Sequence, residues 1–257
     1  MGRRSFILRG ARHALLAVAA GSVGFAVGDV LTQPVAIAAT SRSVSDSRLD
    51  DFNWSWRLKP GQTLKVQGLN GGIRAVSSDD GEAHVRAHKH ARHSDPASVR
   101  IEVNTSDEGV TVCAIYPSRR GGETSCDLEG THQHNDNNDV VVDFEVQVPR
   151  GVRFEPRTVN GGIEASNLDG PVEAGTVNGS VVVSSRSWVS AATVNGSVRA
   201  QMGERRWTEP IEFGTVNGSI TLELPPGAGC ELEASTLNGE VETDFPVTVS
   251  GDRKSVV

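Results

Sequence analysis

The chain has 257 residues and a formal net charge of −7, with 28 glycines and only 5% aromatic residues. An acidic chain lacks the basic face that nucleic-acid binding requires, so the charge argues against DNA or RNA as a partner. The length fits one large domain or two small ones, and the scarcity of aromatic side chains favours a thin core of Val, Ile and Leu.

The first 40 residues have the composition of a signal peptide. A basic start is followed by an apolar run over residues 14–27 and by a small-x-small pattern at Ala36-Ile37-Ala38. Arg3-Arg4-Ser5-Phe6-Ile7 also resembles the twin-arginine export signal. We therefore expect residues 1–40 to be removed and the chain to be exported to the periplasm, the cell surface or the medium. The apolar run is short for a transmembrane span, so an uncleaved leader would be the only predicted membrane contact.

Residues 41–50 are expected to form a polar linker, and residues 51–156 an N-terminal part rich in strands. Phe52, Trp54 and Trp56 alternate as on one face of a strand and are interpreted as a cap over the end of the fold. Longer runs of alternating residues predict four strands, at 83–91, 99–103, 110–116 and 140–148. This part is either a small subdomain or a wider section of one β-stack.

Two pairs of histidines in this part, His88/His90 and His132/His134, are spaced two residues apart. That spacing puts two imidazoles on one face of a strand, where they could bind zinc, nickel or copper. No cysteine or carboxylate completes the set, and basic residues flank it, so we predict no metal site. The polar run 134–139 lacks the Gly and the terminal Glu of an EF-hand calcium loop. No cofactor is expected.

Cys113 and Cys126 flank a loop that contains Pro and Gly. In an exported protein, two cysteines 13 residues apart across such a loop predict a disulfide. Closure of a loop of this length contributes about 3 kcal/mol when chain entropy alone is considered. Cys230 then has no partner and is interpreted as a small apolar residue in a strand.

One short sequence motif, Thr-Val-Asn-Gly-Ser-Val, recurs with small variations through residues 157–250. Five of its Asn-Gly pairs are 18, 17, 22 and 21 residues apart, and a sixth lies upstream. Asn-Gly is a strong turn signal, and the alternating apolar residues on both sides predict short strands. The predicted repeat turns are Asn70-Gly71, Asn160-Gly161, Asn178-Gly179, Asn195-Gly196, Asn217-Gly218 and Asn238-Gly239. Residues 251–257 are expected to form a C-terminal tail.

Two all-β folds fit this repeat. In an antiparallel meander each Asn-Gly would be a hairpin turn, whereas in a β-solenoid or β-roll each repeat would be one coil, with equivalent residues about 4.8 Å apart. We favour the solenoid, because the flanking Thr, Val and Ser repeat as well, and stacking gives each an identical neighbour. Inward asparagines could then form a ladder of side-chain amides. An uncovered end of the stack would allow end-to-end dimers.

Each repeat also contains a second turn-rich stretch, away from its Asn-Gly pair. In two successive repeats this second bend carries aromatic and basic residues. Stacked coils would bring them together as an exposed patch that could bind sugar rings or a protein; otherwise each Trp folds over the edge of the sheet. The predicted ligand patch consists of Arg186, Trp188, Arg205, Arg206 and Trp207.

The sequence resembles a family of exported bacterial β-repeat proteins known as "putative adhesin", a domain of unknown function. The likeness lies in the Asn-Gly repeats, in Val110–Pro117 with the following Cys126, and in Asn138–Phe144 leading to Val148-Pro149. The resemblance implies a β-solenoid-like exported domain with no established reaction.

These features favour a non-catalytic, adhesin-like exported scaffold that binds an envelope or surface protein or glycan. An envelope-stress or regulatory accessory acting through a membrane partner is the alternative. A polysaccharide-active β-helix enzyme would need converging carboxylates, but the glutamates of the repeats are dispersed along strands. The sequence therefore predicts no enzymatic activity.

Overall fold

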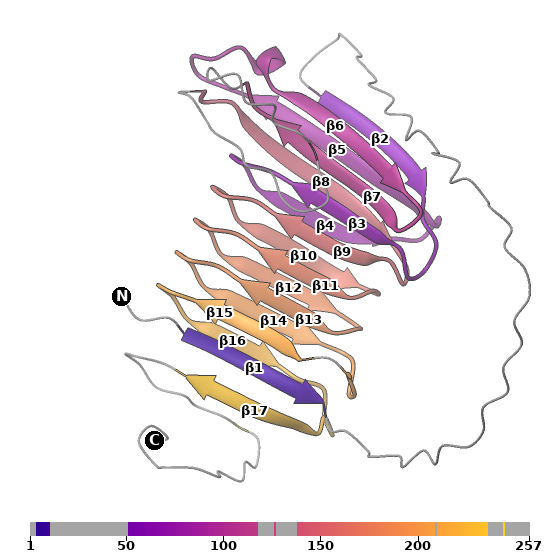
Figure 1. Ribbon diagram of the computed structural model, residues 1–257, viewed down its shortest axis with the longest axis vertical. Coiled ribbons are helices and arrows are strands. Elements are labelled where there is room, and N and C mark those ends of the chain that lie inside the picture. The colour runs from indigo at the N-terminus through magenta and orange to yellow at the C-terminus, as the bar shows by residue number, and fades with distance from the viewer. Residues whose placement is uncertain are drawn as a thin grey trace, which may run out of the picture.

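The computed structural model describes residues 4–10, 51–117, 126, 138–208, 210–235 and 244. These residues form two open β-sheets, which confirms the predicted all-β class. A single 3-10 turn, Pro96–Ser98, is the one helical element in the described ranges. Figure 1 shows the strands side by side in a long stack, with β2 and β6 toward one end and β17 at the other.

The larger sheet contains nine strands. In spatial order they are β17 (Cys230–Ser235), β1 (Arg4–Gly10), β15 (Ile211–Thr215), β13 (Val189–Ala192), β11 (Val172–Gly175), β9 (Arg153–Arg157), β3 (Thr63–Gln67), β7 (Gly109–Ile115) and β6 (Arg100–Ser106).

The smaller sheet contains eight strands. In spatial order they are β16 (Ile220–Glu223), β14 (Val198–Met202), β12 (Val181–Ser185), β10 (Ile163–Leu168), β4 (Ile73–Ser78), β8 (Val141–Pro149), β5 (Glu82–His90) and β2 (Asp51–Arg57).

Each sequence period gives one short strand to each sheet, and equivalent strands pair in parallel. In the smaller sheet Val181 lies between Ile163 and Val198, and in the larger sheet Ala191 lies between Ala174 and Phe213. Along repeat strands such as β12 and β14 buried and accessible residues alternate, and the apolar residues of both sheets share one core of Val, Ile, Leu, Ala and Phe. The repeats therefore supply a core and two outer faces.

The strand-rich N-terminal part joins the same two sheets. The four strands expected there are present as β5, β6, β7 and β8, within three residues of the predicted bounds. Here the pairing is partly antiparallel, because β5 runs against both β8 and β2, and β6 runs against β7. On the edge strand β2, Phe52 and Trp54 pack against the core, while Trp56 stacks on Trp54 and is 51% exposed.

The predicted disulfide between Cys113 and Cys126 is present, with the two Cα atoms 5.7 Å apart. Both cysteines are buried together with Ile115 in a small cluster separate from the main core. As a result every residue of β7 is buried, whereas its neighbour β3 keeps an accessible outer face. Cys230 begins β17.

Part of the predicted signal peptide lies in the larger sheet. Strand β1 pairs antiparallel with β15 on one side and with β17 on the other. The remaining leader residues, the predicted linker at 41–50 and the tail at 251–257 lie outside the described residues.

Candidate functional site

The Asn-Gly motifs line one corner of the stack. Parallel bridges join five asparagines in the order Asn70, Asn160, Asn178, Asn195 and Asn217. The side-chain Nδ2 of each later asparagine donates to Oδ1 of the one before it, at 2.7–2.8 Å. The ladder is exposed rather than inward, because the residue that turns into the core at this corner is the threonine two positions earlier.

These threonines tie successive repeats together. Thr158, Thr176, Thr193 and Thr215 are all buried. Each hydroxyl donates to a glycine carbonyl of the preceding repeat, as in the 2.8 Å bond from Thr193 to Gly179. A polar side chain can be buried at this position because each of the four hydroxyls has a partner.

The glycines of the corner are required by close approach of the backbone. A Cβ at Gly196 would stand 2.1 Å from the carbonyl oxygen of Gly179, and one at Gly179 would stand 2.1 Å from that of Gly161. The asparagines do not adopt the left-handed conformation, since Asn167 is the one non-glycine residue with positive φ in the described part of the chain. The predicted bends are therefore present, but for a reason other than hairpin geometry. Asn238 and Gly239 lie outside the described residues.

A shallow groove runs across the repeats on the outer face of the larger sheet. Its floor is a row of small residues in register, Gly175, Ala192 and Gly214, and one wall is formed by the repeat valines Val177, Val194 and Val216. We call these six residues the repeat groove. Its volume is about 440 Å³, and two of its valines are exposed by 37% each.

Charge flanks the floor of the repeat groove. Two residues before each floor position, and so on the same face of the strand, lie Glu173, Ser190 and Glu212. Arg157 occupies the floor row one coil earlier, next to Gly175, and closes that end. The groove thus has an apolar wall and one basic end, and polar residues follow its floor along the same face of the strands.

Sequence reasoning missed this groove. The signal was available, because the residue before each repeat threonine is Gly or Ala in three consecutive copies and Arg in the one before them.

A charged band continues from the groove toward the N-terminal strands. Arg157 Nη2 contacts Glu173 Oε1 at 2.6 Å, and Arg153 bridges Glu173 and Glu155 at 2.7 and 2.9 Å. Glu155 in turn contacts Lys65 Nζ at 3.2 Å. These five residues alternate in sign across three adjacent strands, so the band presents hydrogen-bonding groups without a strong net charge.

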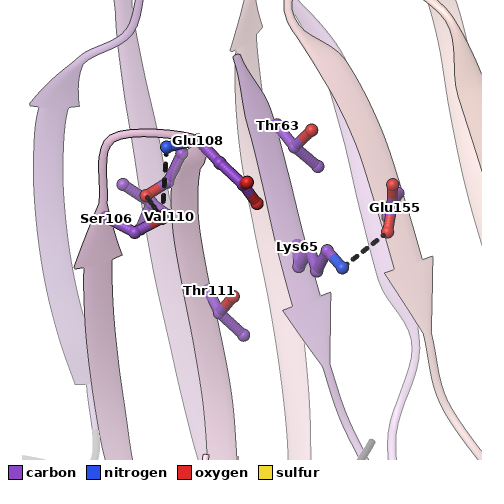
Figure 2. Close-up of a pocket in the computed structure, with 8 residues that line it drawn as sticks. Thr63, Lys65, Ser106, Glu108, Val110, Thr111 and Glu155 are labelled. Carbon is purple, nitrogen blue, oxygen red and sulfur yellow. Dashed lines mark hydrogen bonds and ion pairs between the residues drawn. The ribbon is translucent and has the colours of Figure 1, made fainter. Parts of the chain in front are cut away.

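A small cavity of about 210 Å³ lies where this band meets the β6–β7 hairpin (Figure 2). Lys65 and Glu155 border it on one side, and Ser106 and Glu108 of the hairpin on the other. The hydroxyl of Thr111 at its lining is buried and has no hydrogen-bond partner. The cavity therefore offers an acceptor, a cation and a free hydroxyl to a small polar group.

The two tryptophans of the predicted Arg/Trp ligand patch pack on the protein, while its three arginines are exposed. Trp207 is only 6% exposed and belongs to the core, and Trp188 is half-buried beneath the guanidinium of Arg153, whose Cζ lies 5.1 Å from the ring centroid. Arg186 is exposed but pairs with Asp169 of the preceding coil at 2.9 Å. A large aromatic ring gains more by covering the edge of the core than by facing water.

The other patch residues surround Trp207. Arg205 and Arg206 are exposed, and Arg206 lines a cavity of about 170 Å³ together with both tryptophans.

The histidines of β5 lie on the outer face of the smaller sheet. His88 and His90 are exposed, with ring centroids 5.9 Å apart, and His90 lies 3.9 Å from Asp143. No group of three metal-binding side chains occurs in the ranges that the structure describes. His132 and His134 lie outside those ranges.

Two aspartates hold the turns beside these strands. Hydrogen bonds from Ser94, both side chain and backbone, and from His93 lower the pKa of Asp139 well below its usual range. Hydrogen bonds from Ser78, Glu82 and His84 do the same to the pKa of Asp80. Both carboxylates therefore stay charged far into the acid range and act as fixed acceptors.

Three solved structures resemble this chain. A "putative cell adhesion protein" from Clostridium sporogenes has a TM-score of 0.44 and 9% identity, with 68% of this chain and 100% of that chain covered. A "putative adhesin" from Bacteroides fragilis gives 0.22 and 13% over 70% and 98%, and one from Parabacteroides merdae gives 0.19 and 11% over 68% and 96%. All three carry adhesion names. The names agree with the family that the repeats resemble.

No protein-family model and no curated protein matches the sequence. Among the described residues there is no helix with the length and apolarity to cross a membrane.

Proposed function

We propose that the chain is a non-catalytic, adhesin-like β-solenoid scaffold, exported to the periplasm or cell surface, that binds a glycan of the envelope in its repeat groove. The two sheets are then the two faces of successive coils, with the Asn-Gly corner joining them. This view is supported by the parallel pairing of equivalent strands and by the bridges between successive asparagines.

The repeat groove is the observation that carries the proposal. Val177, Val194 and Val216 place apolar side chains in one row across three repeats, beside a floor of small residues, and such a hollowed apolar row is typical of a binding surface. A floor of Gly175, Ala192 and Gly214 adds nothing to the core packing, but it lets a ligand approach the sheet closely. Since coils lie about 4.8 Å apart, the floor row spans about 10 Å along the stack.

A glycan fits this groove better than a protein surface does. A sugar ring has an apolar C–H face and an edge of hydroxyls, which matches the valine wall on one side and Glu173, Ser190 and Glu212 on the other. The floor is long enough for about two rings. A flat protein interface would need at least several hundred Å² of complementary surface, far beyond the groove itself.

The test is a binding screen of the purified chain against arrays of envelope glycans and envelope proteins. The variant Ala192→Arg fills the groove from an exposed position, so the fold is retained. Val182→Arg is the matched control, because Val182 is an exposed residue of a central strand on the opposite outer face.

We expect glycan binding that falls at least tenfold in Ala192→Arg and is unchanged in Val182→Arg. Glycan binding that survives Ala192→Arg would move the site elsewhere. Binding to proteins alone, or no binding by a folded sample, would overturn the proposal.

A further inference from the structure

The end of the larger sheet holds three strands in an unusual order. Strand β1 lies between β15 and β17 and runs antiparallel to both, so β15 and β17 run in the same direction. Every other pair of successive repeat strands in this sheet, such as β11 with β13 and β13 with β15, is in direct parallel contact. Among the described strands of this sheet, β1 is the one that separates two repeat strands without belonging to a repeat.

The two separated strands are copies of each other. The segment Ile211-Glu-Phe-Gly-Thr-Val-Asn-Gly218 corresponds to Leu232-Glu-Ala-Ser-Thr-Leu-Asn-Gly239, with an offset of 21 residues. This is the spacing of the last two Asn-Gly pairs, so β17 is the sheet strand of the next repeat.

The two copies are also already in register. Phe6 of β1 pairs with Phe213 on one side and with Ala234 on the other, and Ile7 pairs with Glu212 and with Glu233. Both pairs differ by the same 21 residues. Removing β1 and closing the gap by one strand spacing of about 4.8 Å would therefore align equivalent residues without any slip.

We propose that the edge of β15 is an acceptor site for the chain's own β17, and that β1 occupies this site in the chain that still carries its leader. Once the leader is removed, β17 pairs in parallel with β15, with Glu233 opposite Glu212. The larger sheet then continues from one repeat strand to the next without an interruption. The inference rests on the predicted removal of residues 1–40 and is independent of what the repeat groove binds.

The physical reason is a backbone edge. A strand that loses its neighbour exposes a row of N–H and C=O groups, which readily pair with another strand. β17 follows β15 in the same chain and has a similar sequence. It therefore competes favourably with a second copy of the chain for the edge of β15. A dimer through this edge is the alternative outcome of the test.

The test is a disulfide trap in the full-length chain. Glu212→Cys and Glu233→Cys are combined with Cys230→Ser, so that the native Cys113–Cys126 bridge is the only other pair. A protease site is placed within residues 41–50. With β1 in place the two new cysteines are two strand spacings apart, about 9.6 Å, and a disulfide needs Cα atoms within about 7 Å. After release of β1 they are about 4.8 Å apart.

Two controls accompany the trap. Glu212→Cys with Glu231→Cys keeps the substitution type but displaces one thiol by two residues along the strand, to about 8 Å. Phe6→Pro/Ile7→Pro removes adjacent N–H donors of β1, which point to opposite neighbours, and so releases the strand without cleavage.

We expect the intramolecular bridge to form at least tenfold faster after cleavage, and in the double-proline variant, than in the intact chain. The displaced pair should not respond. A bridge that forms equally in the intact chain, no bridge after release, or a bridge between two chains would each overturn the proposal.

Hydrogen exchange of the chain without new cysteines guards against misfolded variants. The β15 amides should stay protected after cleavage and removal of the leader peptide, because β17 replaces β1. Loss of their protection in an otherwise folded chain would contradict the inference.

Discussion

Substituting Gly196 by Ala tests the contact that sets the spacing of the coils. The new Cβ would lie 2.1 Å from the carbonyl oxygen of Gly179, over 1 Å inside normal contact. Moving the coils apart by about 1 Å breaks three bonds of 2.7–3.0 Å that Asn195 makes to Val177, Asn178 and Gly179. At about 1 kcal/mol each the loss is about 3 kcal/mol, and the lower entropy of the unfolded chain returns less than 1 kcal/mol.

The assay is urea unfolding followed by tryptophan fluorescence and circular dichroism. Gly229→Ala is the matched control, since a Cβ there meets nothing within 4 Å and its φ is not positive. We expect a net loss of about 2 kcal/mol for Gly196→Ala and a change below about 0.5 kcal/mol for the control. If the two variants unfold at the same urea concentration, neither the close packing of the corner nor the φ of +157° at Gly196 requires glycine.

Three further predictions concern ionisation and the disulfide. Tyr116 is the single tyrosine, and burial raises its pKa to about 12. Its absorbance titration should therefore have a midpoint near pH 12 in the folded chain and near pH 10 in urea. Because the folded state favours the neutral phenol, the free energy of unfolding should fall as the pH rises through this window. Because the pKa of Asp139 is lowered in the fold, Asp139→Asn should destabilise the chain at neutral pH, and the difference should shrink below about pH 4; a constant difference down to pH 2 would contradict this. Replacing Cys113 and Cys126 by Ser should cost about 3 kcal/mol in urea unfolding and expose the outer face of β7 to hydrogen exchange; unchanged stability would mean that the loop is held by other contacts.

The strands of the repeats could be predicted because each carries its own local signal. Alternating apolar residues and a regular Asn-Gly motif are visible in any one copy, and the all-β class follows from them. The role of the glycine was harder to predict. Asn-Gly has the same appearance in a hairpin and in a stacked corner, and only the neighbouring strand shows that a Cβ at Gly196 would meet the carbonyl oxygen of Gly179, in addition to the positive φ of Gly196.

The candidate site was less accessible to sequence reasoning. Trp207 in a polar bend suggests an exposed binding residue, but its burial depends on how that bend folds over the end of the core, which no local pattern records. The repeat groove depends on small residues, which give no strand, turn or binding signal of their own. Aligning the copies of the repeat places Gly175, Ala192 and Gly214 at the same position.

The ladder of asparagines has a direction. Each amide donates toward the N-terminal coils, and at that end the series finishes on Asn70, whose own amide lies 3.5 Å from the carbonyl of Val140. At the other end the side-chain Nδ2 of Asn217 donates to Oδ1 of Asn195. Hydrogen bonds in such a chain polarise one another, so the coils are coupled. The ladder is therefore polar along the stack: in every described bond the later repeat supplies the donor and the earlier repeat the acceptor.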